Sequence, residues 1–256
     1  MTPTMEELKQ YVGRYDIVPI QEEIYADVVT PIYLLRKIAA SKKNYYLLES
    51  VEGGEKWGRY SFLGYDPIMR VTCQEKKVII KEGQKQKEVE TTDSLSVVRD
   101  ILKQYQAPKI KDMPPFAGGF VGYFSYAMIA HAEPKLKIQR GEFADYDLML
   151  FDKVIAYDHL KQKIVLVANV RVGENLEENY EKARKEIKEI VSLIRDTTPL
   201  EDEPVYDKVQ FECNVTEEEY AEMVEKTKDY IFDGDIFQAV LSRRFVSDYK
   251  GSLINP

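Results

Sequence analysis

The residues best suited to bind a polar ligand are Glu49 and Ser50. They lie in a predicted strand, Tyr45–Val51, directly after an apolar run. A free amino acid is a zwitterion: its ammonium needs an acceptor such as a carboxylate, and its carboxylate needs donors such as a hydroxyl. Successive side chains of a strand point to opposite faces, so Glu49 and Ser50 serve one ligand only if the strand bulges or backbone groups take part. The simpler alternative is an ordinary strand end, with Ser50 in a turn and Glu49 in water.

Two further elements would position this pair. A second strand, Tyr60–Gly64, follows a turn at Gly53-Gly54 and a loop that carries the only tryptophan, Trp57. A helix is expected to begin at Thr30-Pro31, because Thr can cap a helix and Pro at the first position loses no needed N–H. Apolar residues then recur at helical spacing to about Ser41. Together these elements predict a small pocket with polar groups and an apolar wall.

The rest of the chain alternates between paired strands and separate helices, without a regular strand–helix repeat. This pattern predicts an α+β fold with antiparallel, sandwich-like β-sheets flanked by helices. The predicted helices span residues 4–13, 93–105 and 175–195, and the extended segments span 16–26, 68–74, 77–82, 118–126, 147–158 and 163–172, the last two as one long strand pair.

A segment rich in Pro, Thr and acidic residues, 196–207, is the best linker candidate. It divides the chain into a first domain, 1–200, and the start of a second, 201–256. Thr216 and Glu219 form a capping box that begins a helix with an inward apolar stripe running to about Phe232. A long apolar strand, Ile236–Val246, is expected after that helix.

Composition excludes several classes of function. The net charge of −8 argues against nucleic-acid and anionic-membrane partners, which need a basic face. No apolar run approaches the ~18 residues of a membrane helix, and the polar N-terminus is unlike a signal peptide, so we expect a cytoplasmic protein. Cys73 and Cys213 are expected to be free thiols. His131 and His159 are too few for a histidine metal site and are expected at the surface.

The motifs around Glu49 resemble the N-terminal region of anthranilate synthase component I, a chorismate-utilising enzyme family. The interval of 19 residues between Pro31 and Ser50 also matches. The resemblance implies that Pro31, Leu48, Glu49 and Ser50 contribute to a feedback site for L-tryptophan. The matching motifs are Pro-Ile-Tyr-Leu-Leu at 31–35, Leu-Leu-Glu-Ser at 47–50, Gly-Arg-Tyr-Ser-Phe-Leu-Gly at 58–64 and the glycine-marked strand at 118–126.

A second stretch, Gly234–Phe245, is similar to the opening of the family's chorismate-binding catalytic domain. Relatives that add water to chorismate carry Lys at the position of Gln238, because water needs a base whereas neutral ammonia needs only orientation. Gln238 therefore favours an amine-forming enzyme; otherwise it is a polar residue on the wet face of a strand. Arg244, with its neighbour Arg243, could bind a chorismate carboxylate, although arginines at a strand end are more often ion-paired at the surface.

The resemblance implies that the parent protein converts chorismate and ammonia to anthranilate and pyruvate. A partner glutamine amidotransferase subunit, component II, would supply the ammonia. Mg²⁺ would hold the ring carboxylate, with ligands expected downstream of Pro256. We therefore expect this chain alone to make no anthranilate and to bind tryptophan weakly.

Two alternatives remain open at this point. The aminodeoxychorismate synthase large subunit shares the fold and often a Leu-Leu-x-Ser stretch, but the run Trp57–Phe62 favours anthranilate synthase. A non-catalytic amino-acid-sensing module would instead consist of a compact domain, 1–200, that folds alone and ends at the linker.

Overall fold

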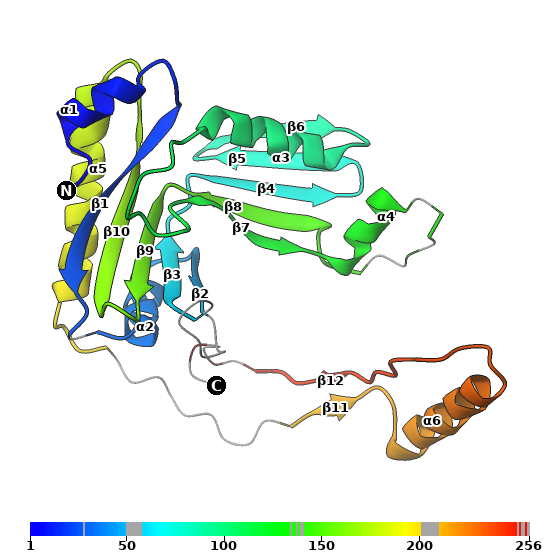
Figure 1. Cartoon of the computed structure of the whole chain (residues 1–256). Helices are drawn as coiled ribbons and strands as arrows, with labels where there is room; N and C mark the ends of the chain where they lie inside the picture. Colours follow the sequence, from blue (N-terminus) through cyan, green and yellow to red (C-terminus); the bar gives the residue numbers. More distant parts are fainter. Residues whose placement is uncertain are drawn as a thin grey trace. The chain divides into compact units, whose positions relative to one another are not determined.

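A computed structural model of the chain describes residues 1–27, 29–49, 58–133, 135–136, 138, 141–200, 210–249, 251 and 254. The chain divides into two compact units, Met1–Leu200 and Glu201–Pro256, which are described separately (Figure 1). The first unit holds two five-stranded antiparallel sheets with helices, which confirms the predicted α+β class. None of the helices in the described parts of the chain is long and apolar enough to cross a membrane.

The first sheet has the strand order β1-β10-β9-β3-β2. Alternate residues of β10 (Lys163–Arg171) pack into two different apolar clusters, Ile164 and Leu166 into one, Val165 and Val167 into the other. Because both faces of this strand are covered, it is apolar almost throughout. The other strands are β1 (Ile17–Tyr25), β2 (Tyr45–Leu48), β3 (Tyr60–Tyr65) and β9 (Lys153–Asp158).

Helices cover one face of the first sheet, where α5 lies along β1 and β10 (Figure 1). The stripe predicted for α5 is buried, including Ala183, Ile187 and Ile190. The opposite face packs against Met113, Phe116 and Ala117. The covering helices are α1 (Met5–Leu8) with a 3-10 turn η1 (Lys9–Tyr11), α2 (Pro31–Ser41) and α5 (Leu176–Arg195).

The second sheet has the strand order β6-β5-β4-β8-β7, and Val98 and Ile101 of α3 pack against it. The prediction missed one edge strand, β6, whose sequence Lys-Gln-Lys-Glu-Val-Glu carries almost no apolar signal. The elements are β4 (Met69–Gln74), β5 (Lys77–Glu82), β6 (Lys85–Glu90), α3 (Ser94–Leu102), η2 (Lys103–Tyr105), β7 (Gly119–Phe124), η3 (Tyr126–Met128), α4 (Ile129–Ala132) and β8 (Tyr146–Phe151).

The predicted long strand 147–158 is wrong as a single element. The chain leaves the second sheet after β8, bends at Asp152 and enters the first sheet as β9, so only β9 pairs with β10. Asn169 fixes this bend: its backbone N–H and its Nδ2 both donate to the carbonyl oxygen of Asp152, at 2.9 and 3.0 Å. Nδ2 also donates to the carbonyl oxygen of Ala117 at 2.7 Å, which ties the loop before β7 to the same point.

The second unit contains β11 (Glu212–Cys213), α6 (Glu217–Phe232) and β12 (Phe245–Val246). The capping box is confirmed, because Glu219 N–H donates to Thr216 Oγ1 and Thr216 N–H donates to Glu219 Oε2. The predicted strand 236–246 is wrong apart from β12, and Phe237 is 93% exposed. The predicted inward stripe of α6 is also wrong, since no described residue of that helix is buried. Among the described residues of this unit, the only sheet is the two-residue pairing of β11 with β12, which is too short to cover these apolar residues.

Candidate functional site

Pro31 occupies the predicted position at the start of α2. The Thr30 hydroxyl accepts from the backbone N–H of Tyr33 at 3.2 Å, and Pro31 is the first helical residue. Its side chain is buried, so the ring helps fix where the helix enters the first sheet's core. The helix then runs to Ser41, as predicted, and is followed by β2.

Leu48 and Glu49 lie at the end of β2, where Leu48 pairs with Phe62 of β3. Leu48 is 45% exposed and Glu49 is exposed, so both are accessible to a ligand. Ser50, the Gly53-Gly54 turn and Trp57 lie outside the described residues. The structure therefore places three of the four predicted tryptophan-binding residues, two of them side by side.

Glu49 belongs to a hydrogen-bonded chain that the sequence reasoning missed. Ser61 Oγ lies 3.3 Å from Glu49 Oε1 and 2.7 Å from His159 Nε2. Ser61 is fully buried in β3, directly opposite Tyr157 of β9. The sequence could not show this chain, because His159 is 98 residues away from Ser61.

The expectation that both histidines lie at the surface is wrong. His159 is half-buried against the Tyr157 ring, with ring centroids 4.7 Å apart. His131 is also half-buried, and its Nε2 lies 3.0 Å from Oδ2 of the buried Asp145. Each ring therefore has a polar side chain of the protein as a partner.

An ion pair anchors the chain segments on both sides of Ser61 and His159. Arg59 Nε donates to Asp158 Oδ1 at 3.1 Å, and its Nη2 donates to Oδ2 at 2.6 Å. Burial alone would raise the pKa of Asp158, but the hydrogen bonds from Arg59 and from the Lys161 backbone outweigh it and lower that pKa. The paired carboxylate thus fixes the start of β3 against the end of β9.

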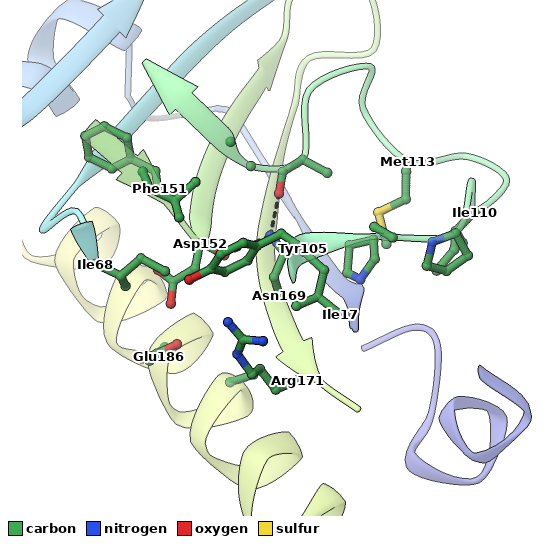
Figure 2. Close-up of a pocket in the computed structure, with 18 of the residues that line it drawn as sticks. Ile17, Ile68, Tyr105, Ile110, Met113, Phe151, Asp152, Asn169, Arg171 and Glu186 are labelled. Atoms are coloured by element: carbon green, nitrogen blue, oxygen red, sulfur yellow. Dashed lines mark hydrogen bonds between the residues drawn. The ribbon is translucent and has the colours of Figure 1, made fainter. Parts of the chain in front are cut away.

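A cavity of about 710 Å³ lies elsewhere in the first unit. Figure 2 shows its mixed lining, with apolar side chains such as Ile17, Ile68 and Met113 around the polar Asn169 and Arg171. None of the predicted site residues that the structure describes lines it.

Three charged residues of the cavity lining have identified partners. Lys153, beside the cavity, lies 2.8 Å from Asp152 and 3.7 Å from Glu186, two carboxylates of the lining. Burial raises the pKa of Glu186, against the opposing effect of Lys153. Arg171 lies 4.6 Å above the Tyr105 ring. These contacts join the β8–β9 bend to α5 and β10 to η2.

Gln238 and Arg244 belong to the second unit and are both exposed. The backbone N–H of Arg244 donates to Asn214 Oδ1 at 2.7 Å, and Arg243 lies 5.3 Å above the Tyr220 ring. Neither contact forms a closed site, so the roles assigned to Gln238 and Arg244 stay predictions. Within the parts of the chain that the structure describes, no three His, Cys, Asp or Glu side chains are grouped to hold a metal ion. These residues do not provide a magnesium site.

Comparisons with known proteins give one consistent result. The family description "chorismate binding enzyme" matches residues 43–255. Anthranilate synthase component 1 of Acetivibrio thermocellus is 39% identical over 252 residues, covering 94% of this chain and 51% of that protein. The protein of the same name in Aquifex aeolicus is 34% identical over 256 residues, covering 97% and 51%.

A solved structure agrees at the level of the fold. The crystal structure of anthranilate synthase component I from Streptococcus pneumoniae matches with a TM-score of 0.60 and 23% sequence identity, covering 91% of this chain and 50% of that one. The chain thus spans about half the length of the relatives that it matches.

Proposed function

Because the chain belongs to the chorismate-binding enzyme family, we propose that it is part of an anthranilate synthase component I whose Glu49 segment senses L-tryptophan. The parent enzyme would convert chorismate and ammonia to anthranilate and pyruvate, and a partner glutamine amidotransferase subunit would supply the ammonia. The relatives compared above are named for this reaction, which favours it over the aminodeoxychorismate alternative.

The observation that carries the sensing role is the position of Glu49. Its carboxylate is exposed at the end of β2, beside the exposed Leu48, and Ser61 contacts it from the buried side. An exposed carboxylate beside an apolar side chain suits the ammonium and the ring of an aromatic amino acid. Pro31, at the start of α2, would shape the same region, and Ser50 would contribute its hydroxyl to the ligand carboxylate.

Catalysis would belong to the second unit and to chain segments beyond the described residues. Gln238 would orient ammonia through its amide, and Arg244 would bind a chorismate carboxylate. Magnesium would supply charge neutralisation at the chorismate carboxylate when bound. The described residues include no group of three His, Cys, Asp or Glu side chains that could hold it.

Ligand selectivity tests the sensing role. We expect L-tryptophan to perturb NMR signals of Leu47–Glu49 and Ser61 at concentrations where L-phenylalanine and glycine have smaller effects, since only tryptophan combines the ammonium with an indole. Equal effects of all three ligands, or perturbations confined to the 710 Å³ cavity, would contradict the assignment.

A further inference from the structure

We propose that His159 is a positioning residue for the effector site: acting through Ser61, it orients Glu49, and its protonation weakens binding of a ligand ammonium there. This inference rests on the proposed role of Glu49 as the ammonium acceptor. It adds a pH-dependent control of ammonium binding, and the evidence for that control is the pair of hydrogen bonds that Ser61 makes with Glu49 and His159.

The direction of the hydrogen bonds follows from the donor inventory. An ionised carboxylate only accepts hydrogen bonds, so Ser61 must donate its single hydroxyl proton to Glu49. The Ser61 oxygen then accepts from His159, whose Nε2 must carry a proton. The neutral ring is therefore the Nε2–H tautomer, and the chain of donors runs from His159 through Ser61 to Glu49. Protonation of His159 adds a proton at Nδ1 and leaves this chain intact.

The surrounding structure holds all the members in place. Ser61 is fully buried in β3. It pairs with Tyr157 of β9, two residues before His159, and this pairing fixes how far Ser61 lies from the histidine. The backbone N–H of His159 donates to the carbonyl oxygen of Arg59 at 2.9 Å. The Nε2 of Gln162 donates to the carbonyl oxygen of His159 at 2.7 Å. Because the ring is held in a fixed position, a change in its protonation would alter the site mainly by changing the charge near Glu49.

The charges near His159 leave Glu49 as the carboxylate that responds. Asp158 precedes the histidine in the sequence, and the carbonyl oxygen of Arg59 accepts from its backbone N–H, but the side chains of Arg59 and Asp158 pair with each other and stay charged between pH 5 and 8. Tyr157 faces the ring and Ser61 accepts from it, and both are neutral. Among the described residues in contact with the His159–Ser61–Glu49 hydrogen bonds, Glu49 is the remaining ionised group. An imidazolium within roughly 6 Å of it would lower the affinity of the site for an ammonium about three- to tenfold.

The chain has two histidines, so the ring signals of each can be followed separately by NMR. His131→Gln assigns the two ring signals, and the pKa of His159 is then measured with and without L-tryptophan. Binding and protonation are reciprocal, so tryptophan should lower the pKa of His159 by roughly 0.5 to 1 unit. Indole-3-propionate, which lacks the ammonium, should not lower it. His131 is the internal control and should not respond to either ligand.

Variants separate the hydrogen-bond role from the charge. His159→Gln keeps an N–H donor for Ser61 without a titrating charge, so tryptophan affinity should be retained and lose its pH dependence between pH 5 and 8. His159→Ala should weaken binding throughout that range. Tryptophan binding with an unchanged His159 pKa, or an equal shift with indole-3-propionate, would overturn this inference alone. Absence of any tryptophan binding to the wild-type chain would overturn the proposed function as well.

Discussion

Asn169 donates from Nδ2 to the carbonyl oxygen of Asp152, 3.0 Å away, at the point where the chain passes from one sheet into the other. The same amide nitrogen donates to Ala117, so one side chain joins β10, the β8–β9 bend and the loop before β7. These three segments are far apart in the sequence, and the bond therefore stabilises the relative placement of the two sheets.

We expect Asn169→Ala to lower the free energy of unfolding by about 1–3 kcal/mol, because it leaves the Ala117 and Asp152 carbonyl oxygens without this donor. Asn44→Ala is the matched control: Asn44 is exposed, and its change should stay within about 0.5 kcal/mol. Urea unfolding followed by circular dichroism measures both. Equal stability of the two variants would show that the amide does not hold the bend.

Gly118 lies against Asn169 and has φ +142°, a conformation that side chains rarely adopt. A Cβ there would lie 2.7 Å from Asn169 Nδ2 and 3.0 Å from the Phe151 carbonyl oxygen. Gly118→Ala should therefore destabilise by about 2 kcal/mol or more, whereas Gly141→Ala, where a Cβ meets open space, should have little effect. Thermal unfolding of Gly118→Ala, Asn169→Ala and the double variant should show non-additive losses, because the two sites touch. Additive losses would argue against direct contact.

The Arg59–Asp158 pair should make stability depend on pH. The pKa of Asp158 is lowered in the folded state, so its contribution is complete above the unfolded pKa near 4 and is lost as pH falls through the folded value. Asp158→Asn should cost about 2 kcal/mol at pH 6 and progressively less below pH 4. Urea unfolding at pH 6 and pH 3 tests this, with the exposed Asp27→Asn as control. A cost that stays constant down to pH 3 would contradict the assignment.

The 256-residue chain should produce no anthranilate from chorismate, magnesium and ammonium. The reason is structural: Gln238 and Arg244 are exposed in a unit where α6 buries none of its described residues. Anthranilate fluorescence provides a sensitive assay. Turnover above that of a Gln238→Ala variant would show that the second unit assembles an active site.

Local signals predicted much of the fold. The Thr30-Pro31 start of α2, the capping box of α6 and the apolar stripe of α5 depend on neighbouring residues, and each is found where the sequence indicates. The bend at Asp152 could not be predicted, because both halves of 147–158 read as strand and only Asn169 determines where the chain changes sheets.

Non-local partners account for the other differences. The charged strand β6 exists because it pairs with β5, whereas the run 236–244 forms no strand because no described residue of its unit pairs with it. For the candidate site, the motif indicates Glu49, whereas Ser61 and His159 come together only through the pairing of β3 with β9.

Calorimetric titration with L-tryptophan of the wild-type chain, Glu49→Gln and Glu90→Gln tests the central claim most directly. Glu90 is an exposed glutamate at the end of β6 and serves as the matched control. We predict weak but measurable binding that Glu90→Gln leaves unchanged and Glu49→Gln reduces at least roughly tenfold, since the ammonium loses its charged acceptor. Equal binding by all three proteins would contradict the account.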